Sequence, residues 1–246
     1  MHALIIAGGD PPDRGALDAA WPGWDREVAL VVAADRGALT ALALGLRPDL
    51  VVGDVDSLDA SEVRRIAEAG IPMQTVRAAK DETDTELAIV AALSRGASGI
   101  TILGALGGPR LDHALANVAL LGLPALAGRP AAILDGRTRV RLLSADDADG
   151  GHDVVLSLPG RVGDLVSLIP LGVDALGITT RGLAWPLRDA VLPAGPARGV
   201  SNVRTAPDAE VCLRRGRLLV VEVADDRPHA VPRASADTAD PIGGPG

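Results

Sequence analysis

Short aliphatic runs alternate with amphipathic stretches through the first half of this chain. The runs are continuous, as expected for strands covered on both faces, and comprise Ala3–Ala7, Val28–Ala33, Leu50–Val52, Met73–Val76, Ile100–Leu103 and Ala131–Leu134. Between them, residues 59–70 have the polar start and the closing glycine of a helix. Residues 83–95 place Leu87, Val90 and Ala91 on one helical stripe, and Gly96 follows them. The alternation predicts an α/β fold with a doubly wound parallel sheet, which binds ligands at the carboxyl ends of its strands.

Beyond residue 142 the pattern becomes that of an all-β domain. Short runs separated by proline and glycine turns predict strands at Asp153–Leu158, Asp164–Ile169, Gly177–Thr180, Val211–Leu213 and Leu218–Val223. The segment Arg214–Arg217 between the last two is expected to form a hairpin turn. We therefore predict an α/β domain over residues 1–143, an all-β sandwich over residues 144–225 and a disordered tail over residues 226–246.

Composition narrows the functional classes. The 246 residues carry a net charge of −8, which argues against a nucleic-acid partner, and the near absence of aromatic residues predicts an aliphatic core. The lone Cys212 excludes an intramolecular disulfide and a cysteine-based zinc site. The opening residues predict a buried strand rather than a secretory signal, and the low-charge stretch Ala114–Gly128 is shorter than the ~20 residues of a spanning helix. We therefore expect a cytoplasmic protein with no nucleic-acid or membrane partner.

Two clusters of acids follow strands of the predicted sheet. Asp54 and Asp56, within Gly53–Ser57, fall on the same side of the chain directly after a strand. Two carboxylates this close repel each other unless a cation lies between them or one of them is protonated, and Mg²⁺ suits such a site. A solvated turn with an aspartate cap explains the pattern equally well. The second cluster, Lys80–Glu86, places four acids around Thr83, a candidate helix cap, and this density favours metal or phosphate chemistry over capping alone.

A third cluster, Leu103–His113, is rich in glycine and leads from a strand into a helix. Its glycines would let backbone N–H groups approach a phosphate, and Arg110 would add bidentate charge. The alternative is that Asp112, and Asn117 shortly after the cluster, are ordinary residues on the surface of that helix. Clusters that follow successive strands of one parallel sheet converge on one edge, and this coincidence favours a phosphate–metal site over several unrelated turns.

Six motifs, in their order and spacing, resemble the thiamine pyrophosphokinase (thiamin diphosphokinase) family. They are Ala34–Ala38, Leu46–Ser57, Lys80–Ala88, Gly107–His113, Gly182–Leu187 and Gly199–Asn202. The resemblance covers residues 3–223 and leaves the tail uncovered. It implies that ATP and thiamine react to give thiamine diphosphate and AMP. It also implies an N-terminal α/β catalytic domain that binds ATP, a C-terminal β-sandwich that binds thiamine, and a homodimer.

The resemblance implies site residues as well. The family's catalytic acids match Asp54, Asp56, Asp81, Asp84 and Asp112. Of these, Asp54, Asp56 and Asp84 would hold Mg²⁺, while Asp81 or Asp112 would orient the attacking hydroxyl. The expected ATP contacts are Asp35, Gly53, Lys80, Thr83, Gly107, Gly108 and Arg110. The chain departs from the family pattern at Val55, where an aromatic residue is usual, and at Pro109, which separates the glycine pair from Arg110.

The thiamine pocket of the family, built between two subunits, matches Trp185 of one chain and Ser201 and Asn202 of the other. An indole face attracts a cation such as the thiazolium by ~0.5–2 kcal/mol, and Ser201 and Asn202 would hydrogen-bond the aminopyrimidine. The alternatives are a core position for Trp185 and a plain turn at Gly199–Asn202.

Two rival functions are a pterin-alcohol pyrophosphokinase of the same fold and a non-catalytic nucleotide-binding regulatory protein. The motif around Trp185 argues against the first, because it belongs to the part of the chain that resembles the thiamine domain. The five acids argue against the second, since a binding module does not need so many uncompensated carboxylates.

Overall fold

The computed structural model describes residues 1–54, 58–75, 81–146 and 152–225. It contains two compact units, of which the first comprises Met1–Leu142 and Leu219–Val223, and the second comprises Leu143–Leu218 together with Ala224 and Asp225. The boundary predicted between residues 143 and 144 falls inside a continuous strand, Thr138–Ala145. The predicted tail, residues 226–246, lies outside the described residues.

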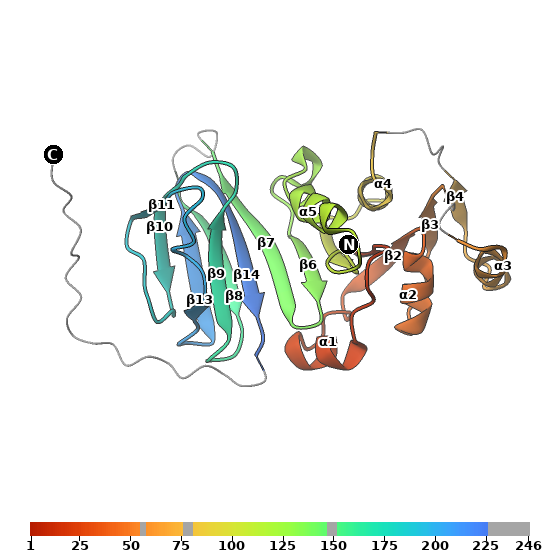
Figure 1. Ribbon diagram of the computed structural model, residues 1–246, viewed down its shortest axis with the longest axis horizontal. Coiled ribbons are helices and arrows are strands. Elements are labelled where there is room, and N and C mark those ends of the chain that lie inside the picture. Colours follow the sequence, from red (N-terminus) through yellow and green to blue (C-terminus); the bar gives the residue numbers. More distant parts are fainter. Residues whose placement is uncertain (55–57, 76–80, 147–151, 226–246) are drawn as a thin grey trace. The chain divides into compact units, whose positions relative to one another are not determined.

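A mixed, mostly parallel sheet forms the centre of the first unit (Figure 1). Its strands are β1 (His2–Ile6), β2 (Val28–Ala34), β3 (Leu50–Gly53), β4 (Met73–Thr75), β5 (Gly99–Leu103), β6 (Ala131–Asp135) and β7 (Thr138–Ala145). They lie in the order β7-β6-β5-β1-β2-β3-β4, and only the neighbours β6 and β7 pair antiparallel. All six strands predicted in the first half are present, and their fully buried residues are aliphatic. The order reverses between β1 and β5, which makes the carboxyl edge of these two strands a switch point where ligands bind.

Among the described residues, five α-helices lie between these strands: α1 (Arg14–Ala20), α2 (Gly37–Ala43), α3 (Ala60–Glu68), α4 (Asp84–Ser94) and α5 (Leu111–Leu120), with a 3₁₀ turn, η1 (Pro124–Leu126), after α5. The sequence predicted α3 and α4 from their caps, and both caps are formed. Asp59 accepts hydrogen bonds from the backbone of Ser61 and Glu62, and Glu62 accepts one in return from the Asp59 N–H. This reciprocal arrangement is a capping box, which fixes the start of α3.

The strand β14 (Gly216–Val223) returns to the first unit with its second half. Its Glu222 is 1% exposed and accepts two hydrogen bonds of 2.7 Å from Arg139 and a third of 2.7 Å from Arg141, both on β7. Arg139 also lies over the ring of Trp21, 4.6 Å from its centroid. A buried carboxylate needs such partners because its charge is costly to remove from water.

The second unit is built from antiparallel strands. Between β7 and β14, the chain forms the strands β8 (Val154–Pro159), β9 (Leu165–Pro170), β10 (Ala175–Arg181), β11 (Ala190–Leu192), β12 (Asn202–Val203) and β13 (Asp208–Leu213). One sheet has the order β11-β10-β13-β8, and β12 pairs with β9 elsewhere in the unit.

The hairpin predicted at Arg214–Arg217 is wrong, because β13 and β14 belong to different sheets. The chain crosses between sheets here, and Arg215 forms an isolated bridge with Leu176. Gly216 has φ +106°, and a Cβ on it would lie 2.5 Å from the Asp174 carbonyl oxygen. The glycine therefore permits a close backbone crossing rather than a hairpin. Of the helices described in either unit, none has both the length and the apolar character needed to cross a membrane.

Candidate active site

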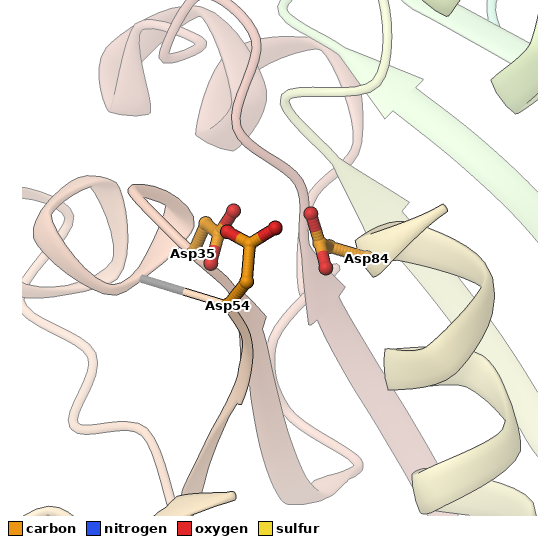
Figure 2. Close-up of side chains that lie close together, drawn as sticks. All are labelled: Asp35, Asp54 and Asp84. Atoms are coloured by element: carbon orange, nitrogen blue, oxygen red, sulfur yellow. The ribbon is translucent and has the colours of Figure 1, made fainter. Parts of the chain in front are cut away.

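Three aspartates gather at the carboxyl edge of the parallel sheet. Asp35 follows β2, Asp54 follows β3, and Asp84 is the first residue of α4. One carboxylate oxygen from each lies within 4.8 Å of the other two. Figure 2 shows the three carboxylates converging on a common space from three separate elements. All three side chains are half-buried, so solvent screens their charges only partly.

The local backbone explains how Asp35 reaches this position. Its φ is +45°, a left-handed conformation that aspartate tolerates better than most residues. Its N–H donates a 3.0 Å hydrogen bond to the carbonyl of Val52, which ties the turn after β2 to the neighbouring strand. The Asp35 carboxylate then lies directly over Gly53, where any Cβ would overlap it. A side chain at residue 53 would therefore displace the Asp35 carboxylate from its present position.

Asp84 is positioned by the start of α4. Thr83 is the N-cap, and its Oγ1 accepts a 3.2 Å hydrogen bond from the Glu86 N–H, as the sequence predicted. The helix buries Ala88, Ile89 and Ala92 and contacts β1, β2 and β3. This packing directs the N-terminus of α4 toward the ends of those strands, and a carboxylate at that terminus is favoured by the helix dipole.

The electrostatics of the cluster suit a hard cation. Two unit charges 4.8 Å apart repel each other by about 3 kcal/mol at an effective dielectric constant of about 20. Three carboxylates supply only oxygen ligands, which Mg²⁺ and similar ions prefer, and few enough of them to leave positions for phosphate and water. A divalent cation bound by these oxygens would replace the mutual repulsion with attraction.

The cluster differs from the predicted metal set in one member. Asp54 and Asp84 were expected as ligands, while Asp35 was expected to contact ATP, and the structure places all three together. The third expected ligand, Asp56, and the expected ATP contact Lys80 lie outside the described residues. The sequence carries a signal for Asp35, because this residue directly follows a strand of the same sheet, as Asp54 does.

A glycine loop after β5 forms a second part of this edge. Gly104, Gly107 and Gly108 have φ of +63°, +81° and +80°, conformations that favour glycine. The Gly9 N–H donates a 2.9 Å hydrogen bond to the Gly104 carbonyl. Asn117 of α5 is 8% exposed and donates a 2.9 Å hydrogen bond to the Ala105 carbonyl. Asn117 is therefore a buried anchor of the loop, and the helix-surface alternative for it is wrong.

Arg110 and Asp112 pair with each other beyond this loop. The Arg110 guanidinium donates to both carboxylate oxygens of Asp112, at 2.9 and 2.6 Å, and both side chains are 64% exposed. The hydrogen bond from Arg110 is the largest cause that lowers the pKa of Asp112 to about 2. Asp81 is also exposed, and neither Asp81 nor Asp112 belongs to the three-carboxylate cluster.

The second unit holds the residues expected to bind thiamine. Trp185 is 55% exposed, so the alternative of a core position for it is wrong. Asn202 is 8% exposed, and its side chain makes two hydrogen bonds with the backbone of Trp185: Oδ1 accepts from the N–H at 3.0 Å and Nδ2 donates to the carbonyl at 2.7 Å. Ser201 is exposed, with φ +63°, and its N–H donates to Ser167. Asn202 therefore holds the segment that presents the indole.

Two family models match this chain in succession. Residues 24–126 match the catalytic domain of thiamin pyrophosphokinase, and residues 152–218 match the vitamin B1 binding domain of thiamin pyrophosphokinase. Together the matches cover more than half of the chain, and the first contains the whole three-carboxylate cluster.

Individual relatives agree with these matches over nearly the full length. The thiamine pyrophosphokinase of Bacillus subtilis is 28% identical over 225 residues, which cover 92% of this chain and 100% of the relative. Among solved structures, thiamin pyrophosphokinase from Geobacillus thermodenitrificans is similar with a TM-score of 0.75 and 27% identity, over 93% of this chain and 100% of that one. The yeast enzyme, at 15% identity and a TM-score of 0.71 over 91% of this chain and 86% of that one, shares the fold.

Proposed function

This chain belongs to the thiamin pyrophosphokinase family, and from that premise we propose that it transfers the pyrophosphoryl group of ATP to the hydroxyl of thiamine, giving thiamine diphosphate and AMP. The observation that carries the proposal is the cluster of Asp35, Asp54 and Asp84 inside the catalytic-domain match. Asp35 and Asp54 follow β2 and β3, at the carboxyl edge of the parallel sheet where a fold of this kind binds its ligand.

We propose Mg²⁺ as the ion of this site, held by Asp35, Asp54 and Asp84, with Asp56 retained as a predicted ligand. The fit rests on three oxygen donors close enough to share one ion and on the absence of soft ligands among them. A bound Mg²⁺ would neutralise negative charge on the phosphate oxygens.

In the proposed reaction, the thiamine hydroxyl oxygen bonds to the β-phosphorus of ATP as the bond from that phosphorus to the oxygen bridging the α-phosphate breaks. AMP carries that oxygen away, and the hydroxyl proton is released. Such transfers depend on positioning and charge stabilisation more than on covalent work by the protein. The backbone N–H of Gly107 and the guanidinium of Arg110 are proposed to contact phosphates, and Asp81 or Asp112 to orient the hydroxyl. Gly108 is proposed to shape the phosphate-binding turn, because its N–H donates to Asp10.

For thiamine, we propose that the exposed indole of Trp185 faces the thiazolium cation. Asn202 is assigned the role of holding Trp185, because both ends of its amide bond the Trp185 backbone. Ser201 remains a proposed contact to the aminopyrimidine. A homodimer that completes the pocket is proposed as well, and sedimentation at micromolar concentration tests it directly.

The finer features of the fold belong to the same proposal. We interpret the first unit as a doubly wound ATP-binding domain and the second as a thiamine-binding β-sandwich. The use of ATP fits the cytoplasmic location that the sequence predicts.

The decisive experiment is release of AMP from Mg-ATP in the presence of either thiamine or a hydroxymethyl-pterin. AMP with thiamine alone supports the proposal; AMP with the pterin alone, or with neither, refutes it. Asp54→Asn and Asp84→Asn should each lower kcat by about 100-fold or more, because each removes a charged oxygen ligand. Glu68→Gln, which changes an exposed acid on α3, is the matched control and should leave kcat unchanged.

A further inference from the structure

Asp10 reaches across the switch point of the sheet to the glycine loop. It follows β1 and Gly8–Gly9, and its Oδ2 accepts a 2.7 Å hydrogen bond from the Gly108 N–H. A Cβ on Gly107 would lie 3.1 Å from the same oxygen, so the carboxylate also packs against the neighbouring glycine. The carboxylate of Asp10 thus contacts the turn formed by two successive glycines, at φ +81° and +80°.

This contact completes the anchoring of the loop at its far end. The start of the loop is fixed by the hydrogen bonds from Gly9 to Gly104 and from Asn117 to Ala105. A pair of glycines has more backbone freedom than any other dipeptide, so ordering it requires a partner outside the turn. Asp10 supplies that partner through a charge-assisted hydrogen bond, which is stronger than a bond between neutral groups.

The backbone that carries Asp10 has little conformational freedom. Pro11 and Pro12 follow it, and a proline fixes its own φ and restricts the residue before it to extended conformations. Pro12 is also buried, which holds this short segment against the unit. The carboxylate is therefore presented to Gly108 from a backbone with few alternatives.

The negative charge at this position has a cost. It affects Asp135, which lies at the end of β6. Burial is the main cause that raises the pKa of the Asp135 carboxyl, and the charge of Asp10 raises this pKa further. The same charge opposes the approach of a phosphate to the glycine turn. Anchoring and repulsion therefore have opposite effects on nucleotide affinity, and replacing Asp10 by asparagine or by alanine separates them.

We propose that Asp10 is a positioning residue: by accepting the hydrogen bond from the Gly108 N–H, it holds the Gly107–Gly108 turn in the conformation that presents the Gly107 N–H to the phosphates of a nucleoside triphosphate. The inference rests on the proposed function, since it assigns those phosphates to this edge of the sheet. Asp10 lies outside the six motifs that resemble the family and outside the catalytic-domain match.

The test compares Asp10→Ala with Asp10→Asn in the full chain. Asp10→Ala should raise the KM for ATP and the Kd for Mg-ATP about tenfold, because a hydrogen bond to a charged acceptor is lost. The KM for thiamine should stay within about twofold, since the change lies in the phosphate site. Asp10→Asn keeps an oxygen acceptor and should restore both ATP constants to within about threefold of the wild type.

Asp13→Ala is the matched control: Asp13 lies in the same segment but caps α1, where its side chain accepts a 2.7 Å hydrogen bond from the Ala16 N–H. It should lower Tm without changing the Kd for Mg-ATP. The proposal is overturned if Asp10→Ala leaves that Kd unchanged or lowers it, or if Asp10→Asn raises it as much as alanine does. The Kd is measured by calorimetry without turnover, so a wild type that binds Mg-ATP but releases no AMP would refute the proposed function alone.

Discussion

Replacing Gly53 by alanine should damage the candidate active site through Asp35. A Cβ at residue 53 would overlap the Asp35 carboxylate, one of the three whose oxygens lie within 4.8 Å of one another. The Asp35 backbone is tied to Val52, so its side chain has to rotate away from the cluster to make room. The mutation leaves every carboxylate in the chain but moves one of them.

The size of the expected loss in rate follows from the displacement of the Asp35 carboxylate. Relief of the overlap requires a movement of about 1 Å or more, and a misplacement of this size costs about 100-fold in rate, or about 2.7 kcal/mol. Gly53 also has φ +155°, which a side chain rarely adopts, so the mutation should cost a further ~1–3 kcal/mol of folding stability. Gly45→Ala controls for this backbone effect, because Gly45 has φ +74° and nothing within 4 Å of its Cβ position.

A double-mutant cycle isolates the mechanism. Gly53→Ala should lower kcat/KM about 100-fold, Asp35→Ala about 100- to 1000-fold, and the double mutant no further than Asp35→Ala alone. The coupling energy from AMP-release kinetics should therefore approach the full ~2.7 kcal/mol of the glycine mutation. Gly45→Ala should lower Tm and leave kcat/KM unchanged. Additive losses in the double mutant would refute the reasoning, since the alanine would then act without displacing Asp35.

Three other perturbations test separate parts of the molecule. Asn202→Ala removes both hydrogen bonds to the Trp185 backbone and should raise the KM for thiamine about tenfold or more with little change in the KM for ATP, measured by steady-state kinetics. The depressed pKa of Asp112, about 2 against an ordinary 3.8, means that its pairing with Arg110 stabilises the fold above pH 3.8 and is lost as the pH falls through 2. Arg110→Gln should return that pKa toward 3.8 in an NMR titration. Glu222→Gln should lower the free energy of unfolding by about 3–5 kcal/mol in urea, because two arginines are left without their buried carboxylate; an unchanged midpoint would contradict its structural role.

Local patterns along the chain predicted much of the first unit. The aliphatic runs became β1 to β6, and β1, β2, β3 and β5 are mostly buried, because a strand covered on both faces needs no polar position along its length. The edge strand β4 is the exception, since two of its three residues are exposed. The caps at Asp59 and Thr83 predicted the starts of α3 and α4, since a cap satisfies backbone groups within three residues of itself. Asp54 and Asp84 were predicted at the site for a similar reason. Asp54 directly follows β3 and Asp84 begins α4, and the hydrophobic pattern predicts both of these elements.

Tertiary structure alone decided the relations between distant segments. Asp35 joins the three-carboxylate cluster because β2 and β3 pair in a register that ties its backbone to Val52 and opens space over Gly53. Asp10 meets Gly108, and Asn117 meets Ala105, only after β1 and β5 have paired and α5 has folded back toward the sheet. The wrong hairpin at Arg214–Arg217 has the same origin, since turn chemistry does not say which sheet the next strand joins. Sequence patterns report the environment of one element at a time, whereas the distance between two carboxylates depends on strand order and register, which the packing of the whole unit sets.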